Sequence, residues 1–208
     1  AGYLKLGAVL GADAVKVRRK LLTQVDPGVQ IDQDASFSGW YHDTPRDLML
    51  PWENVLVGSP VGPCPAWLFP ADGGDAASTW VIQVHGRGAT RAECLRAVPV
   101  FHALGMPVLV ASYRNDGDAP RSRRGAYALG AEEWRDVDAA IAYALSRGAR
   151  RVVLMGWSMG GALALQTAVS SGHRGLIAGL VLDSPVVDWR SVLRYQADRM
   201  GLRAPFPQ

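Results

Sequence analysis

Short apolar runs alternate with longer helical patterns from about residue 80 onward. The helical segments place apolar side chains three or four positions apart, as do Trp134, Val137, Ile141 and Leu145 in the second of them. The apolar runs are continuous, as in the buried strands of parallel sheets, and span residues 80–84, 107–112, 151–155 and 180–183. The helical segments span residues 90–104, 131–146, 159–171 and 188–200. This alternation predicts right-handed strand–helix–strand units and an α/β fold with a mainly parallel, doubly wound sheet.

The first half of the chain is patterned differently. Two apolar runs, 53–57 and 66–69, are separated by SPVGPCP, which predicts a hairpin or a tight connection between strands. Residues 1–50 show weak periodicity, and we expect an N-terminal helix followed by an irregular arm. The sequence thus divides into this arm, 1–50, and a core, 51–208.

The N-terminal segment allows two interpretations. It reads AGYLKLGAVLGADAV and then turns basic at KVRRK, residues 16–20. One interpretation is an amphipathic helix that packs on the domain. The other is the end of a cleaved or truncated membrane anchor with its basic flank on the cytoplasmic side. A cytoplasmic location and a membrane tether through a missing N-terminal segment therefore both stay open.

Composition narrows the class of protein. The chain has 208 residues, 49% hydrophobic and 20% charged, with a formal net charge of +3. These values are typical of one soluble globular domain and argue against a nucleic-acid partner, because no basic stripe or base-stacking motif is present. The two cysteines, Cys64 and Cys94, are expected to be buried or half-buried thiols rather than parts of a zinc site or a disulfide framework. We expect no metal and no organic cofactor.

Candidate chemistry centres on the segment Gly156-Trp157-Ser158-Met159-Gly160. The strand RVVLM runs into this G-x-S-x-G pattern and the helix ALALQTAV leaves it, so Ser158 is predicted on a sharp strand-to-helix turn with its hydroxyl exposed. The helix N-terminus favours developing negative charge there. A glycine-rich turn of a nucleotide-binding fold is the alternative, but no G-x-G-x-x-G or Walker pattern occurs. Ser158 is therefore the predicted nucleophile.

A second segment, His85-Gly86-Arg87-Gly88, follows the strand at 80–84. Acyl transfer needs two N–H donors aimed at the oxyanion of the tetrahedral intermediate. The predicted donors are the backbone N–H groups of Met159 and Arg87. His85 is predicted to brace this loop rather than to act as the general base.

Five segments, in the order HGRGATR, SYRND, GAYALGAEEW, GWSMGG and LDSP, resemble the α/β-hydrolase superfamily, most closely its bacterial serine esterases and peptidases. The resemblance covers about residues 50–190. It implies the order serine, acid, histidine, with the acid after the seventh strand and the histidine after the eighth. Strands counted along this chain reach only the sixth, at 180–183, so we expect a sheet that is incomplete at its C-terminal edge, followed by the start of a cap.

The general base and the acid are therefore hard to place. Among the four histidines, only His173 follows Ser158, and it comes after the helix that begins there, roughly 20 Å away at 1.5 Å per residue. Asp183 and Asp188 are candidate acids, although an acidic residue before Ser-Pro more often ties down the next loop. We expect the remaining catalytic groups beyond residue 208.

The sequence thus predicts a serine hydrolase that cleaves an ester, thioester or peptide bond in a small-molecule or peptide acyl substrate. An acyltransferase would use the same groups. The alternative from another class is a catalytically silent hydrolase-fold binding protein, or one part of an assembly that another chain completes.

Overall fold

The computed structural model describes residues 4–31 and 41–201. The chain divides into two compact units, Ala1–Tyr41 and His42–Gln208. Each unit is described by itself below. The residues 202–208, at the end of the predicted cap segment, lie outside the described part of the chain.

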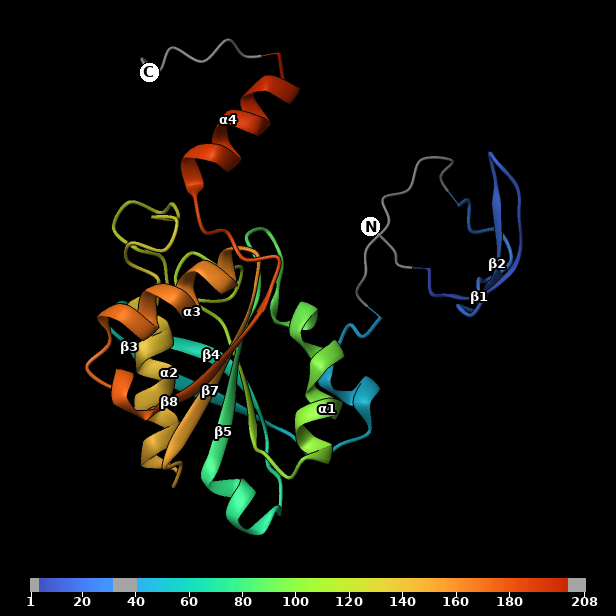
Figure 1. Cartoon of the computed structure of the whole chain (residues 1–208). Coiled ribbons are helices and arrows are strands. Elements are labelled where there is room, and N and C mark those ends of the chain that lie inside the picture. The colour runs from blue at the N-terminus through green and yellow to red at the C-terminus, as the bar shows by residue number, and fades with distance from the viewer. Residues whose placement is uncertain (1–3, 32–40, 202–208) are drawn as a thin grey trace. The chain divides into compact units, whose positions relative to one another are not determined.

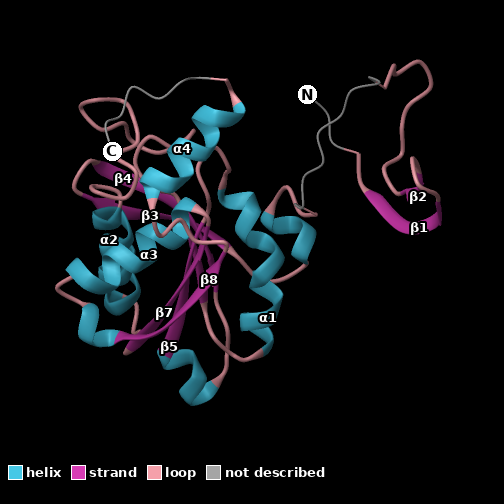
Figure 2. Ribbon diagram, turned by 45° about the horizontal axis from the view of Figure 1, so that its top comes forward, coloured by secondary structure: helices cyan, strands magenta, loops and turns pink. Residues whose placement is uncertain are grey.

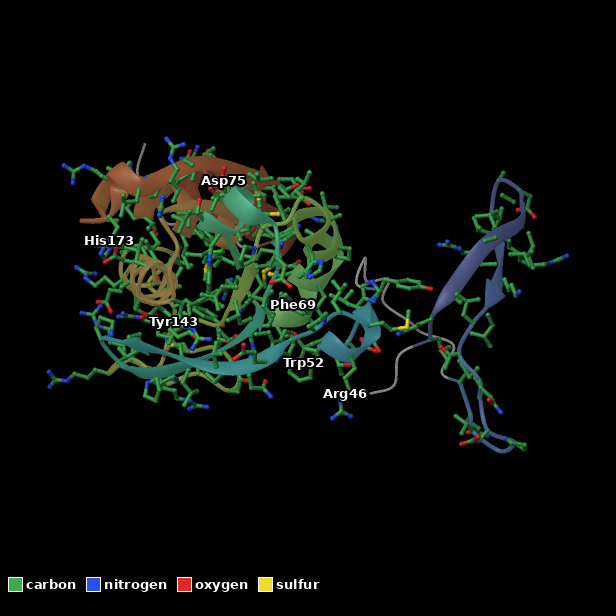
Figure 3. The ribbon with its side chains drawn as sticks, turned by 90° about the horizontal axis from the view of Figure 1, so that it is seen from below. Arg46, Trp52, Phe69, Asp75, Tyr143 and His173 are labelled. Atoms are coloured by element: carbon green, nitrogen blue, oxygen red, sulfur yellow. The ribbon has the colours of Figure 1, made fainter. Side chains whose placement is uncertain are left out.

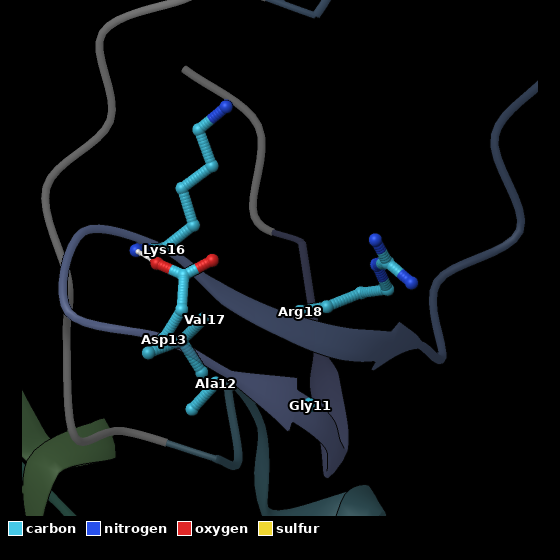
Figure 4. Close-up of a pocket in the computed structure, with 6 residues that line it drawn as sticks. All are labelled: Gly11, Ala12, Asp13, Lys16, Val17 and Arg18. Atoms are coloured by element: carbon cyan, nitrogen blue, oxygen red, sulfur yellow. Dashed lines mark hydrogen bonds between the residues drawn. The ribbon is translucent and has the colours of Figure 1, made fainter.

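The first unit contains an antiparallel β-hairpin of β1 (Leu6–Ala12) and β2 (Val17–Leu21). The expected N-terminal helix was wrong. The side chain of Asp13 favours a turn, because its Oδ1 accepts the N–H groups of Val15 and Lys16, each at 2.8 Å. Figure 4 shows the contact with Lys16. Valines on both sides of that turn and glycines before it also lower helix propensity. Among residues 4–31 and 41–201, no helix is long and apolar enough to cross a membrane.

A six-stranded sheet organises the second unit, in the order β3-β4-β6-β5-β7-β8 (Figures 1 and 2). Its members are β3 (Glu53–Ser59), β4 (Gly62–Phe69), β5 (Thr79–Val84), β6 (Val108–Ala111), β7 (Arg151–Trp157) and β8 (Ile177–Asp183). β3 and β4 form the expected hairpin, and β4 pairs antiparallel with β6. The pairs β6·β5, β5·β7 and β7·β8 are parallel. The prediction of a mainly parallel sheet is confirmed, with β8 as its outer strand on one side.

Helices cover both faces of this sheet, with α1 on one face and α2 and α3 on the other (Figure 1). The α-helices are α1 (Val98–Ala103), α2 (Trp134–Ser146), α3 (Met159–Ser170) and α4 (Trp189–Arg199). The 3-10 helices are η1 (Pro45–Leu48), η2 (Gly74–Ser78), η3 (Arg91–Ala97) and η4 (Arg174–Leu176). The helix expected over 90–104 is divided into η3 and α1. Pro99 explains the division, because it has no N–H to donate to the preceding turn and is tolerated only in the first turn of a helix.

The main core lies between the sheet and the α2–α3 layer. Val137 and Ile141 of α2 are fully or almost fully buried there, as their helical spacing predicts. Ala66 and Leu68 of β4 face this core. Phe69 lies on the other face of the same strand, and its side chain is also fully buried (Figure 3). The thiols of Cys64 and Cys94 are buried and free, as predicted, and burial raises the pKa of both.

Candidate active site

Ser158 lies at the turn between the end of β7 and the start of α3. Its backbone has φ of +51° and ψ of −114°, a conformation that L-residues rarely adopt. The residue is exposed, while its neighbours Trp157 and Met159 are buried. The Ser158 side chain makes no hydrogen bond within the part of the chain that the structure describes. The turn therefore presents a hydroxyl that the fold leaves available.

The two glycines of the motif are needed for close backbone contact. A Cβ added at Gly160 would lie 2.1 Å from the carbonyl oxygen of Val84, at the end of β5. A Cβ at Gly156 would lie 2.3 Å from the carbonyl oxygen of Gly160. Real Cβ atoms do not approach backbone so closely, so only glycine allows the turn to fold against the end of β5.

The loop after β5 lies directly beside the serine. A Cβ built on Gly86 would be 3.3 Å from the Ser158 Cβ. The next residue, Arg87, is exposed. Neither Arg87 N–H nor Met159 N–H donates a hydrogen bond to any residue in the ranges 4–31 and 41–201. The structure thus brings together the three residues that the sequence singled out, an exposed serine and two residues whose backbone N–H groups have no internal acceptor.

The direction of the Arg87 N–H follows from the peptide group that contains it. The carbonyl oxygen of Gly86 accepts from Ala89 N at 3.3 Å, from Tyr113 Oη at 3.2 Å and from His85 Nδ1 at 2.8 Å. These donors hold the carbonyl toward the buried side. Because the peptide bond is trans, the Arg87 N–H points the opposite way, out of that buried cluster.

His85 is fully buried beneath this loop, and its ring stacks on Tyr113 with centroids 4.6 Å apart. Its Nε2 lies 2.9 Å from Asp116 Oδ2, and its Nδ1 contacts the Gly86 carbonyl oxygen. Both ring nitrogens are therefore engaged by buried partners, and neither contacts Ser158. The expected bracing position of His85 is the one the structure shows.

The Asp116 carboxylate is the side-chain partner of the buried His85 ring. Burial acts to raise the pKa of its carboxyl, but the hydrogen bond and the charge of His85, with the N–H of Gly117, outweigh burial and lower the pKa below its ordinary value. The carboxylate is therefore ionised at neutral pH. Burial also raises the pKa of the Tyr113 hydroxyl well above its usual range, so Tyr113 remains a donor.

The other histidines have contacts elsewhere. His173 follows α3, about 18 Å along the helix from Ser158 at 1.5 Å per residue, and its Nδ1 lies 2.8 Å from Asp138 Oδ1. His102 Nε2 lies 3.0 Å from the carbonyl oxygen of Pro70. His42 precedes η1. None of the four hydrogen-bonds to Ser158 within the described ranges, so the structure shows no serine–histidine pair there.

The two candidate acids have different surroundings. The main-chain oxygen of Asp183 accepts the Ser158 N–H at 2.9 Å, and its half-exposed carboxylate accepts from Ser184 Oγ at 3.0 Å. Asp188 caps the N-terminus of α4 by accepting the Arg190 N–H at 2.9 Å. Neither contact joins an acid to a histidine.

Comparison with known proteins identifies the family to which this fold belongs. A model of the alpha/beta hydrolase family matches residues 73–208. The chain belongs to the alpha/beta hydrolase family. No curated protein matches the sequence significantly.

Solved alpha/beta hydrolase relatives share the fold at low sequence identity. An esterase from Pyrococcus furiosus superimposes with a TM-score of 0.63 at 21% identity, covering 77% of this chain and 60% of the esterase. A putative alpha/beta hydrolase of unknown function from Agrobacterium tumefaciens gives 0.53 at 18%, covering 64% and 60%. A bacterial heroin esterase gives 0.53 at 20%, covering 66% and 45%. The chain thus spans about three fifths of the length of the Pyrococcus esterase.

Sequence reasoning missed three side chains around this alpha/beta hydrolase turn. Tyr113 lies in the SYRND segment, but the sequence assigned it no role. Glu93 stands three residues after Thr90, a spacing typical of a helix capping box, which would direct its carboxylate back to the Thr90 N–H. Instead, Glu93 Oε2 accepts the N–H of Gly86 at 2.6 Å. Arg96 lies beside it, with Nη2 3.9 Å from Glu93 Oε1.

The described ranges, 4–31 and 41–201, bring no three His, Cys, Asp or Glu side chains together in a way that could hold a metal ion. A hollow in the first unit is lined by Gly11, Ala12, Asp13, Lys16, Val17 and Arg18 of the hairpin (Figure 4). It contains none of the groups that surround Ser158.

Proposed function

We propose that this protein is a serine hydrolase that cleaves an acyl bond through an acyl-serine intermediate. The observation that carries the proposal is the exposed Ser158 hydroxyl on a strained turn, beside the two residues, Arg87 and Met159, whose N–H groups have no internal acceptor. Esters are the first substrate class to test, because structural neighbours include esterases. Thioesters and peptides remain within the proposal, and an acyltransferase would differ only in its acceptor.

In the proposed reaction, Ser158 Oγ attacks the carbonyl carbon of the substrate and loses its proton to a general base. The N–H groups of Arg87 and Met159 would stabilise the oxyanion that forms. Collapse of the intermediate expels the alcohol, which takes the proton back from the base. Water then cleaves the acyl-serine by the same steps, giving the free acid and restoring the hydroxyl.

No histidine of the described residues hydrogen-bonds to Ser158. Both ring nitrogens of His85 are already in contact with buried partners, and His102 and His173 have other partners. We propose that further chain of the same protein or a partner chain supplies the base and the acid. The same observation supports the second candidate, a catalytically silent protein of this fold that binds its ligand without turnover.

Labelling with a fluorophosphonate, applied to the protein together with the polypeptide that supplies the base, distinguishes the two candidates. A reactive Ser158 forms a covalent phosphonyl-serine, and Ser158→Ala removes the label. Ser170→Ala is the matched control, since Ser170 is exposed at the other end of α3. We expect mass spectrometry to place the label on Ser158 in the wild type and in Ser170→Ala. Equal labelling of Ser158→Ala and the wild type, or none of either, would overturn the serine hydrolase proposal.

A further inference from the structure

Glu93 and the predicted nucleophile Ser158 both lie close to Gly86. A Cβ built on Gly86 would be 3.3 Å from Glu93 Oε2 and 3.3 Å from the Ser158 Cβ. The Glu93 side chain is only 15% exposed. We propose that Glu93 is a positioning residue that fixes Gly86, and through it the Arg87 N–H, relative to Ser158. This inference rests on the proposed function.

The hydrogen bonds around Gly86 show how Glu93 could act. Its carboxylate accepts the Gly86 N–H at 2.6 Å, which fixes the peptide group before Gly86. His85, Tyr113 and Ala89 fix the carbonyl of the peptide group after it. Glycine has the widest choice of backbone angles, so the orientation of the Arg87 N–H depends on both anchors. The bond to Glu93 also occupies the Gly86 N–H, whereas the Arg87 N–H donates to no described residue.

Arg96 connects the same carboxylate to the turn that carries Ser158. Its Nη2 lies 3.9 Å from Glu93 Oε1 and 3.8 Å from Asp183 Oδ2, and its guanidinium lies 5.1 Å from the centre of the Trp157 ring. The main chain of Asp183 in turn accepts the Ser158 N–H. The loop and the nucleophile turn are therefore tied to one cluster of charged side chains, with Glu93 nearest the loop.

A positioning residue of this kind affects the stability of the transition state more than it affects substrate binding. Oxyanion stabilisation depends on donors that lie at hydrogen-bond distance from the developing charge, and displacement by about 1 Å can cost a hundredfold in rate. Loss of Glu93 should therefore lower the maximal rate at which Ser158 reacts. The fluorophosphonate concentration that gives half of that maximal rate should stay unchanged. A residue needed only for folding would lower the amount of reactive protein instead.

Two variants, prepared in the form of the protein that includes the polypeptide supplying the base, test the assignment. Glu93→Gln keeps the side-chain shape and a neutral acceptor, and Glu93→Ala removes the acceptor. Glu53→Gln on the edge strand β3 is the control, because that glutamate is about half exposed and contacts Arg147. The measurement is fluorophosphonate labelling of Ser158 over a concentration series, normalised to folded protein by near-UV circular dichroism.

We expect Glu93→Ala to lower the maximal labelling rate tenfold to a hundredfold, Glu93→Gln to lie between it and the wild type, and Glu53→Gln to match the wild type. Hydrogen exchange of the Gly86 amide should also be faster in Glu93→Ala. If Glu93→Ala does not fold, Glu93→Gln carries the test. Glu93 variants that label as fast as a reactive wild type would overturn this inference alone. A wild type that does not label overturns the proposed function, and Glu93 then has no catalytic role.

Discussion

Backbone groups around Ser158 fall into two sets, those whose hydrogen bonds are satisfied inside the protein and those whose bonds are not. Gly86 uses its N–H and its carbonyl internally, and the Ser158 N–H donates to Asp183. The N–H groups of Arg87 and Met159 have no acceptor within the described ranges. Buried or constrained N–H groups are normally paired. Unpaired N–H groups beside one exposed hydroxyl support the proposal that a developing anion binds there.

The pairing of Asp116 with His85 makes a stability prediction. Asp116→Asn replaces the charged acceptor of a fully buried ring with a neutral one. We expect the free energy of unfolding at pH 7 to fall by about 1.5–3 kcal/mol, the usual contribution of a hydrogen bond to a charged group. Denaturant titration measures this change. Asp118→Asn is the control, because Asp118 forms a half-exposed ion pair with Arg91 and such pairs contribute under about 1 kcal/mol.

The same pair predicts a pH dependence. The pKa of Asp116 is lower in the folded protein than its ordinary value of 3.8, so the ionised form stabilises the fold above that value. The stabilisation is lost as the pH falls through the folded-state pKa. The stability difference between wild type and Asp116→Asn should therefore shrink below about pH 4. A difference that stays constant down to about pH 2 would contradict the assignment of a charged pair.

At the scale of elements, hydrophobic periodicity predicted the central strands and the helices α2 and α3, because burial against one sheet imposes it. The N-terminal hairpin was missed. Its apolar residues fit a helical face as well as a strand, and the turn at Asp13 depends on two side-chain hydrogen bonds that no periodicity reveals. The positions of Ser158 and Arg87 followed from a local turn motif. The contact of Glu93 with Gly86 did not, because it replaces the capping contact that the local spacing predicts.

The packing of α3 against β5 gives a prediction at this scale. In Gly160→Ala, the new methyl group would lie 2.1 Å from the Val84 carbonyl oxygen, and backbone must shift to admit it. We expect a loss of at least about 3 kcal/mol in the free energy of unfolding and loss of Ser158 labelling. Gly172→Ala is the matched control, since a Cβ there meets nothing within 4 Å. A Gly160→Ala protein as stable and as reactive as the control would show that the turn tolerates a side chain.

The whole molecule combines a well-packed second unit with a hairpin whose described residues are mostly exposed. The core cluster and the hydrophobic residues packed on it all lie between Val55 and Trp189. A two-stranded hairpin by itself is marginally stable in water. The groups that surround Ser158 also belong to the second unit. Stability and reactivity of that unit should therefore depend on its own core rather than on β1 and β2.

Truncation tests this independence. A chain that begins at His42 lacks β1 and β2 but keeps the sheet, its helices and Ser158. We expect its melting temperature to change by less than about 2 °C, which corresponds to under about 1 kcal/mol for a domain of this size, and its Ser158 labelling rate to equal that of the full chain.

A chain that begins at Gly62 is the contrasting control, because it also loses β3, whose Val57 is buried and which pairs with β4 along its whole length. That chain should lose its cooperative thermal transition. If the His42 chain instead melts as poorly as the Gly62 chain, residues 1–41 contribute to the stability of the hydrolase unit.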